Sequence, residues 1–283
     1  MRLSRLLAAA GPSLLLACAT ARTPSTPRET PLAARVEAPG LLFDVLYTPA
    51  DALELPRIER GLLAAGARVS RWGAFREGVF IHVLPDHASL EAAVDRRGYP
   101  WLRAWAFADD VLLQSPRSWN AANPADDSDV VELLAHEMTH ALMYQLLRTS
   151  DDPAWIPEEP PLWFREGMAS VTAGQERRRL SRDQLSRWLD EHPADDPLHP
   201  SAELYRTEQH AVYSAAHRAF EMLLRVSGDD AVRDLLGRVR AGAGFPDAFK
   251  EATGRALSDF ERDAIRGRFE PLASAGATGA GSP

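Results

Sequence analysis

VVELLAHEMTHALMYQ, residues 130–145, has a strong helical pattern. Its apolar residues recur at the three- and four-residue spacing of an α-helix, which Ser128 or Asp129 could cap. Within it stands HEMTH, residues 136–140, which has the pattern H-E-x-x-H. Residues four apart lie on one face of a helix, with Cβ atoms about 5–6 Å apart. The spacing therefore predicts that the imidazoles of both histidines can bind one Zn²⁺.

Glu137 directly follows the first histidine, so on a helix it lies beside the metal and does not bind it. A carboxylate in that position can take a proton from a metal-bound water. The pattern thus predicts Glu137 as the general base of a hydrolytic site. A buried helix with two hydrogen-bonded histidines would carry the same five letters, so the rest of the chain has to supply a third ligand.

A second segment, WFREGMAS at residues 163–170, offers that ligand in Glu166. With both segments present, the chain resembles the gluzincin metallopeptidases, and in particular their peptidase MA-like branch, which carries H-E-x-x-H on one helix and W-x-x-E-G-x-A on the next. The resemblance implies that His136, His140 and Glu166 bind zinc. It also assigns the general base to Glu137.

The resemblance covers about residues 41–270 and implies a thermolysin-like α+β fold. In that fold an N-terminal α/β lobe with a mixed sheet and an edge hairpin precedes the H-E-x-x-H helix, and a helical C-terminal lobe follows. It further implies that the hydroxyl of Tyr213 helps to stabilise the oxyanion of the reaction. The alternative for Tyr213 is a core residue with a hydrogen-bonded hydroxyl.

One position departs from the family pattern. Thermolysin-like relatives carry an Asp four residues after the third ligand, where it supports a ligand histidine, and this chain has Ser170 there. Because carboxylates around a metal site orient its imidazoles, we expect an Asp or Glu from elsewhere to do so, or a weaker site. Glu132, one turn before His136, is a candidate, although a solvated helix residue is the plainer interpretation.

The periodicity of the remaining chain predicts an α/β lobe followed by helices. We expect strands at 41–47 and 78–84, a hairpin of 105–108 with 111–114, and helices at 51–68, 86–95, 182–191, 207–226, 229–241, 246–252 and 258–269. The edge of the hairpin could pair with an extended peptide, or a loop could cover it.

The N-terminus has the pattern of a targeting segment: a basic start, then a short apolar run that is too short to span a membrane. Leu15-Leu16-Ala17-Cys18 resembles the lipobox of bacterial lipoproteins, which implies a lipid anchor on Cys18. We therefore expect a signal peptide at 1–17, a disordered tether at 18–40, an N-terminal lobe at 41–148, a C-terminal lobe at 149–270 and a disordered tail at 271–283.

Composition narrows the classes of function. The chain has 283 residues, is 45% hydrophobic and 25% charged, and has a formal charge of −8, which suits a globular protein and disfavours nucleic acid as a partner. A single cysteine excludes an internal disulfide and any zinc site built on several cysteines. The histidines at 82, 87, 192 and 199 have no ligand spacing, and those at 210 and 217 are weaker candidates than Tyr213.

Together these features predict a zinc-dependent metallopeptidase that acts on a peptide or protein substrate and is lipid-anchored in the bacterial cell envelope. Ala19 after Cys18 favours the outer membrane, by analogy with lipoprotein sorting. Two alternatives stay open: a binding or scaffold lipoprotein of the same fold, and a hydrolase of a non-peptide amide such as cell-wall material. The sequence sets neither the oligomeric state nor the cleavage preference.

Overall fold

The computed structural model describes residues 31–38, 41–119, 126–149 and 159–266. The predicted signal peptide, with Cys18, and the predicted tail lie outside these residues. The strands are β1 (Leu32–Ala38), β2 (Leu41–Tyr47), β3 (Val79–Leu84), β4 (Ala104–Ala106) and β5 (Asp110–Gln114). The helices are α1 (Leu55–Val69), α2 (His87–Ala93), α3 (Asp127–Leu147), α4 (Leu162–Ala173), α5 (Arg182–Glu191), α6 (Ala202–Thr207), α7 (Gln209–Arg240), α8 (Phe245–Thr253) and α9 (Leu257–Arg266).

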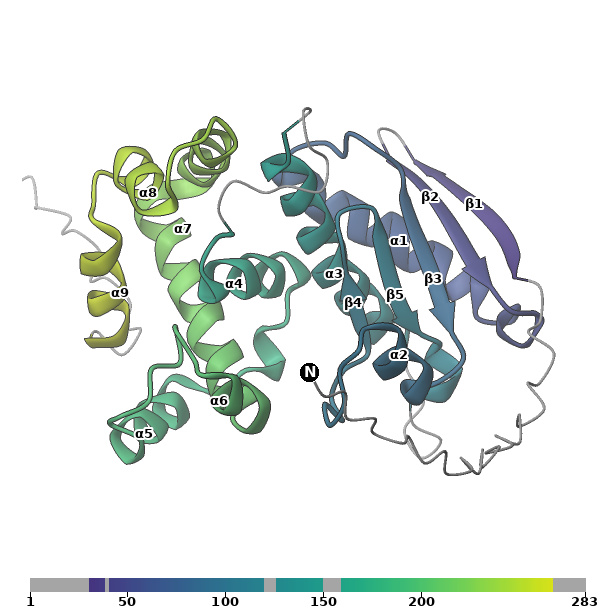
Figure 1. The fold of residues 1–283 in the computed structure, drawn as a ribbon, viewed down its shortest axis with the longest axis horizontal. Coiled ribbons are helices and arrows are strands. Elements are labelled where there is room, and N and C mark those ends of the chain that lie inside the picture. The colour runs from purple at the N-terminus through teal and green to yellow at the C-terminus, as the bar shows by residue number, and fades with distance from the viewer. Residues whose placement is uncertain (1–30, 39–40, 120–125, 150–158, 267–283) are drawn as a thin grey trace, which may run out of the picture. The chain divides into compact units, whose positions relative to one another are not determined.

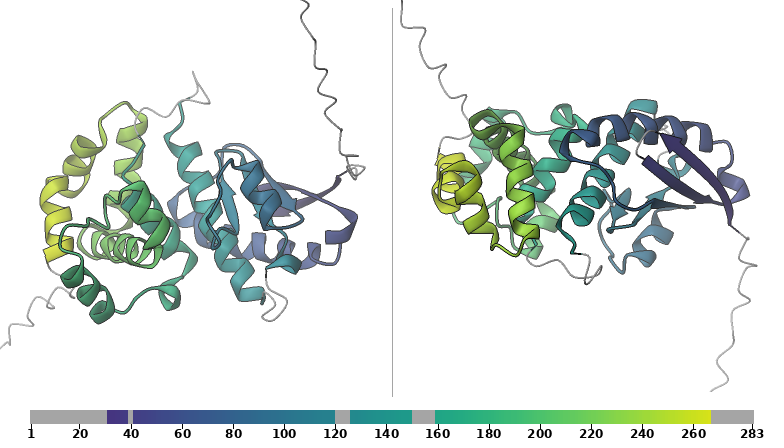
Figure 2. Two further views of the ribbon diagram at one scale, coloured as in Figure 1. Left: turned by 60° about the horizontal axis from the view of Figure 1, so that its bottom comes forward. Right: turned by 90° about the horizontal axis from the view of Figure 1, so that it is seen from above.

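The strands form one mixed sheet in the order β1-β2-β3-β5-β4 (Figure 1). The pairs β2–β3 and β3–β5 are parallel, and the two outer pairs are antiparallel. Alternate residues of β3, namely Val79, Ile81 and Val83, are buried in the core, as expected for a strand with one covered face. Helices α1 and α3 cover one side of the sheet and α2 lies on the other (Figures 1 and 2). The short strand β4 is left at the edge, next to α3.

β1 corrects the expectation that residues 18–40 form a disordered tether. Leu32–Ala38 pairs antiparallel with β2 along its whole length. Arg35 and Asp44, which face each other across the two strands, form an ion pair of 2.9 Å, and Val36 is buried. The sequence did not predict this strand, because residues 18–40 are polar as a whole and Val36 is the one strongly apolar residue of the strand that points into the core.

The helical part is built around α4 and α7, which lie side by side (Figure 1). Gly167 allows this close approach, since a Cβ atom there would stand 2.4 Å from the carbonyl oxygen of Ala216 and 2.6 Å from Phe220 Cβ. Gly228, at φ 77°, interrupts α7 where the sequence predicted a break between two helices. Helix α6 was not predicted from the sequence.

Trp163 anchors α4 in the core of the helical part. Its indole stacks on Phe260 and its Nε1 donates a hydrogen bond to Glu261 Oε1 at 2.7 Å, both in α9. On the other side, Trp72 Nε1, just after α1, donates to Thr172 Oγ1 of α4 at 2.7 Å. These contacts fix α4 between α9 and the end of α1, and α4 also packs against α3 (Figure 1). Among the described residues, no helix has both the length and the apolar character to cross a membrane.

Candidate metal centre

Helix α3 carries the two histidines and begins one turn before the sequence suggested. Its N-cap is Asp126, whose carboxylate accepts a hydrogen bond from the backbone N–H of Asp129 at 2.8 Å. The prediction of Ser128 or Asp129 as the cap was therefore wrong. The acidic side chains of the first turn interact favourably with the positive end of the helix dipole. Asp127 also accepts hydrogen bonds from two arginines of α1, which stabilises this additional turn.

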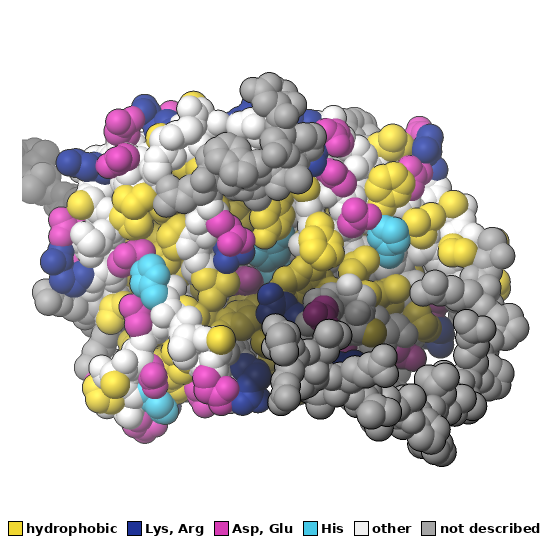
Figure 3. All heavy atoms as spheres, in the orientation of Figure 1, with side chains coloured by type: hydrophobic (Ala, Val, Ile, Leu, Met, Phe, Trp, Pro, Cys, Tyr) yellow, Lys and Arg dark blue, Asp and Glu magenta, His cyan; other side chains and the backbone are white. Residues whose placement is uncertain are grey.

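His136 and His140 stand one above the other on the inner face of α3, as their spacing predicted. Their ring centroids are 4.9 Å apart, and their two Nε2 atoms are 3.2 Å apart. Each imidazole thus turns the same nitrogen toward a common point. A histidine lies recessed among hydrophobic side chains near the middle of the face drawn in Figure 3.

Glu166 reaches this point from α4. Its Oε2 atom lies 3.3 Å from His136 Nε2 and 3.7 Å from His140 Nε2. The structure therefore brings together the three residues that the family resemblance selected as zinc ligands. Gly167 and Trp163, its neighbours in the motif, set the position of α4 and so of this carboxylate.

The distances among the three ligand atoms fit a tetrahedral ion. With bonds of about 2.0–2.1 Å, two ligands of a tetrahedral Zn²⁺ stand about 3.3–3.4 Å apart, and the three separations here are 3.2, 3.3 and 3.7 Å. Glu166 Oε2 is buried without a hydrogen-bond partner in the described residues. A buried carboxylate oxygen of that kind is costly unless a cation compensates it. The donor set therefore fits zinc.

The charges of this cluster are strongly coupled. Burial by itself would raise the pKa of Glu166, but the charge of His140 and the close approach of both imidazoles outweigh it, so the pKa falls far below its ordinary value. Burial would lower the pKa of His140, and the carboxylate of Glu166 reverses this and raises it. The cluster thus favours a negative Glu166, the form that binds a metal.

Glu137 lies beside the ligands and has no arginine or lysine partner among the described residues. Burial raises the pKa of its carboxyl above the ordinary value, and the nearby Glu166 adds to the rise. The two histidines and a hydrogen bond from the backbone N–H of Ala106, in β4, oppose it. A raised pKa improves a carboxylate as a proton acceptor near neutral pH.

The support for His136 differs from what was expected. Its Nδ1 donates to the amide oxygen of Gln175 at 3.2 Å, which leaves Nε2 with a free lone pair for a metal. A neutral amide therefore takes the place of the expected Asp or Glu. Gln175 lies just beyond α4, and no spacing rule links it to a histidine 39 positions earlier, so the sequence held no signal for it.

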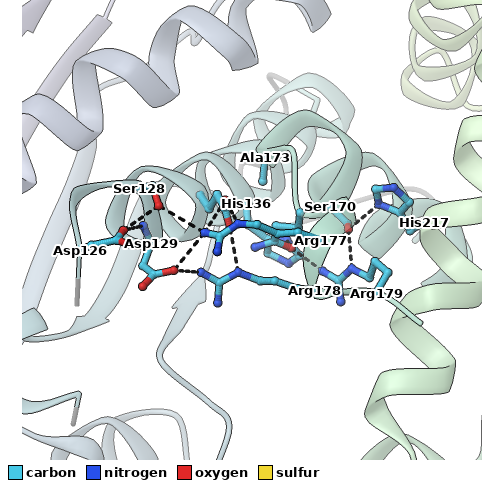
Figure 4. Close-up of polar contacts among 12 residues, drawn as sticks. Asp126, Ser128, Asp129, His136, Ser170, Ala173, Arg177, Arg178, Arg179 and His217 are labelled. Atoms are coloured by element: carbon cyan, nitrogen blue, oxygen red, sulfur yellow. Dashed lines mark hydrogen bonds and ion pairs between the residues drawn. The ribbon is translucent and has the colours of Figure 1, made fainter. Parts of the chain in front are cut away.

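Glu132, the candidate for this support, and Ser170, which stands where the family has an Asp, are both engaged elsewhere. Glu132 is buried and forms ion pairs with Arg177 and Arg178, so the interpretation as a solvated residue was wrong. The Oγ of Ser170 lies 2.8 Å from His217 Nδ1. Figure 4 shows the two arginines reaching along α3 and Ser170 facing His217 on α7.

Tyr213 lies near the histidines, as predicted. Its ring centroid is 6.3 Å from that of His136, and its hydroxyl lies 2.9 Å from the hydroxyl of Tyr205. Burial raises the pKa of Tyr213 well above its ordinary value, and the negative charge of Glu166 raises it further, so this side chain is a neutral donor. Trp101 packs edge-on against both tyrosines. The sequence indicated neither Trp101 nor Tyr205, which lies in the unpredicted helix α6.

The other histidines lie apart from the centre. His217 is buried and bonded to Ser170, whereas His210 is exposed. Each of the remaining four contacts a different residue: His82 contacts Asp110, His87 contacts Glu91, His192 stacks on Trp188, and His199 contacts Glu261. Leaving these four unassigned agrees with their positions.

Comparison with known proteins places this architecture. No protein-family model matches the chain. Over 146 residues it is 27% identical to the uncharacterized protein YhcO of Bacillus subtilis (strain 168), a match that covers 50% of this chain and 42% of that protein. The chain thus spans less than half the length of this relative.

Among solved structures, aminopeptidase A of Legionella pneumophila, in complex with aspartic acid, matches with a TM-score of 0.50 and 16% identity over 84% of this chain and 28% of its own. An aminopeptidase N family protein of Idiomarina loihiensis matches with a TM-score of 0.46 and 14% identity over 83% of this chain and 46% of its own. At such identities a likeness shows the fold alone, and only the first carries weight. It confirms the predicted α+β, thermolysin-like fold, with both histidines on α3.

Proposed function

We propose that the protein is a zinc-dependent metallopeptidase that hydrolyses peptide bonds and is held by a lipid on Cys18 in the cell envelope. The observation that carries the proposal is the convergence of His136 Nε2, His140 Nε2 and Glu166 Oε2 at tetrahedral separations. The fold shared with an aminopeptidase supports it.

In this proposal each residue has a distinct task. His136, His140 and Glu166 would hold the ion, and Gln175 would fix the ring of His136. Bound there, Zn²⁺ would supply the Lewis acidity that activates a water and polarises the substrate carbonyl. Three protein ligands leave a position for that water.

Glu137 and Tyr213 would carry out the proton transfer and the charge stabilisation. Glu137, fixed by the N–H of Ala106, would accept the proton of the attacking water and then deliver it to the leaving amine. The hydroxyl of Tyr213 would donate a hydrogen bond to the developing oxyanion. Tyr205 would orient that hydroxyl through the bond between the two side chains.

The test is a Glu137→Gln variant of the protein. We expect it to keep one zinc per chain and to lose peptidase activity by about 10²–10⁴-fold, the usual contribution of a general base. Glu191→Gln, an exposed carboxylate at the end of α5, removes the same charge and is expected to leave activity unchanged. Full activity in Glu137→Gln would exclude the proposed base.

The lipid anchor is tested separately. We expect mass spectrometry of protein from the bacterial membrane fraction to find an acylated N-terminal Cys18, and a Cys18→Ser variant to leave that fraction. An unmodified Cys18 in membrane-free protein would refute the anchor. This result would leave the peptidase proposal untouched.

One observation favours the alternative of a binding or scaffold protein of this fold. The support for His136 comes from a neutral amide, Gln175, and a neutral partner makes the imidazole a weaker ligand than a carboxylate would. Stoichiometric zinc without cleavage of any peptide in a broad library would select this alternative. Glu137, a buried carboxylate without an arginine or lysine partner among the described residues, favours catalysis.

A further inference from the structure

Arg179 is the unusual charge beside the metal centre. It follows the short turn Glu176–Arg178 that leads away from α4. Its guanidinium lies over the ring of Tyr213, with Cζ 5.1 Å from the ring centroid. Figure 4 shows it close to Ser170 and His217, whereas its two preceding neighbours reach in the opposite direction.

Every side chain in direct contact with the guanidinium of Arg179 among the described residues is neutral. Its Nε donates to Ser170 Oγ at 3.0 Å and its Nη2 donates to Gln175 Oε1. Its Nη1 forms no hydrogen bond to the described residues. Within the same residues, no carboxylate oxygen lies within 4.0 Å of its guanidinium.

The two neighbours of Arg179 in the chain show how this protein otherwise treats such charges. Arg177 and Arg178 each pair with Asp129 and Glu132. Both are more exposed to solvent than Arg179. The more buried arginine is therefore the one that has no carboxylate in direct contact among the described residues.

This arrangement is unfavourable for the free protein. A charge that is withdrawn from water without a counter-ion loses hydration that neutral acceptors restore only in part. Burial accordingly lowers the pKa of Arg179 below its ordinary value, although it stays charged at neutral pH. The aromatic face of Tyr213 stabilises a cation only modestly. An anion from outside would complete the arrangement.

The position of Arg179 ties it to the candidate centre. Gln175 Oε1 accepts hydrogen bonds from both Arg179 and His136, and the ring of Tyr213 lies beside both. A divalent ion would balance the two carboxylates of the centre, Glu137 and Glu166, so Arg179 would leave one net positive charge. A substrate with a negative charge close to its scissile bond would neutralise it.

From these contacts we infer that Arg179 is a specificity-determining residue that binds a carboxylate of the substrate. The carboxylate is either an acidic side chain near the scissile bond or the free C-terminus of a short peptide. The substrate class is therefore acidic peptides or peptides cut close to their C-terminus. This inference rests on the proposed function, because it assumes a peptide in the centre.

Binding without turnover tests it. The zinc-loaded Glu137→Gln protein is titrated calorimetrically with alanine nonapeptides that carry one Glu at each position in turn, and with their Gln counterparts. Each peptide is made as the free acid and as the C-terminal amide, which separates the two sources of carboxylate. We expect one acid form to bind about 10- to 100-fold more tightly than its neutral counterpart, as for a charge-assisted hydrogen bond.

The preference is then measured after Arg179→Gln is added. We expect the ratio of acid to neutral affinity to fall to about one, and Arg179→Lys to retain part of it. Arg187→Gln, on the exposed side of α5, removes the same charge and should keep the full ratio. Because the ratio is taken within each variant, a change in zinc content affects both peptides alike.

Three results would overturn the inference: equal affinities in the Glu137→Gln protein, a preference that survives Arg179→Gln, or no measurable binding of any peptide. Cleavage by the wild-type protein is scored independently. Absent cleavage together with an Arg179-dependent preference would refute the peptidase while upholding the recognition of a carboxylate. Cleavage at equal rates for acidic and neutral peptides would uphold the peptidase and refute the recognition of a carboxylate.

Discussion

Glu132 and Glu137 lie five residues apart on the same helix, each 7% exposed, yet their surroundings differ completely. Glu132 receives hydrogen bonds from Arg177 at 2.9 Å and Arg178 at 2.7 Å. Glu137 receives one from a backbone N–H and has its pKa raised by burial. One region of α3 thus satisfies its charges internally, and the other, one turn and a half away, does not.

The two glutamates thus have different roles: Glu132 stabilises the structure, and Glu137 lies in the candidate catalytic centre. We call Asp129, Glu132, Arg177 and Arg178 the arginine clamp, because these ion pairs fasten the turn after α4 to the start of α3 (Figure 4). That turn carries Gln175, which supports His136. The clamp therefore positions the centre, whereas the centre keeps a carboxylate oxygen without a hydrogen-bond partner, on Glu166, for a ligand.

Removal of a ligand should give the largest effect. Zinc binding by four-ligand sites is worth about 10–16 kcal/mol, so one ligand accounts for about 3–4 kcal/mol and its loss for roughly 10²–10³-fold in affinity. We expect Glu166→Gln to weaken zinc binding by this factor, measured by competition with a chelator. An unchanged zinc affinity would show that Glu166 is not a ligand.

Two of the three ligands follow from a short spacing in the sequence, whereas the third, Glu166, was selected by the resemblance to the gluzincins. The H-E-x-x-H pattern fixes two side chains on one helical face, and the sheet elements follow from two-residue alternation. The cap at Asp126, the short helix α6 and strand β1 were missed, because each depends on tertiary contacts or on very few residues. Gln175 and Arg179 join the centre only through the path of the chain after α4.

Replacement of the amide that supports His136 should have the next largest effect. In Gln175→Leu the Nδ1–H of His136 loses its acceptor, and partners of this kind are worth about 10–100-fold in metal affinity. We expect zinc affinity to fall by that factor while the helix content by circular dichroism stays the same. Gln175→Glu, with a charged acceptor, should instead raise it. Identical affinities in the three proteins would remove Gln175 from the account.

Disruption of the arginine clamp tests whether its ion pairs stabilise the fold. Glu132→Gln removes one of the two anions that Arg177 and Arg178 share and leaves them only Asp129. Since the two arginines are partly exposed, we expect a loss of about 1–3 kcal/mol in the free energy of unfolding. Urea denaturation measures this loss. Zinc stoichiometry should remain one per chain, because Glu132 contacts no ligand. Loss of zinc at unchanged stability would reverse the roles assigned to the two carboxylates.

A third carboxylate, Glu221, extends the comparison, and we expect its replacement to have the smallest effect on stability. Burial would raise the pKa of Glu221 on α7, but the close imidazole of His217 and a hydrogen bond from Arg218 lower it to about 2. A lowered pKa in the folded state stabilises the protein above the ordinary value of 4.5, and this contribution disappears as the pH falls through about 2.

We therefore expect Glu221→Gln to destabilise the protein at pH 6, with a difference from wild type that shrinks steadily between pH 4.5 and pH 2. Chemical denaturation at several pH values measures it. A difference independent of pH would mean that the glutamate acts through packing and not through its charge.

The central claim is that two imidazoles of α3 and one carboxylate of α4 bind a single zinc ion. X-ray absorption at the zinc edge of the purified protein tests it most directly. We expect one zinc per chain with two imidazole nitrogens and carboxylate or water oxygens at about 2.0–2.1 Å. We also expect the imidazole signal to be halved in His140→Ala. A protein that binds no zinc, or zinc whose imidazole signal survives that substitution unchanged, would contradict it.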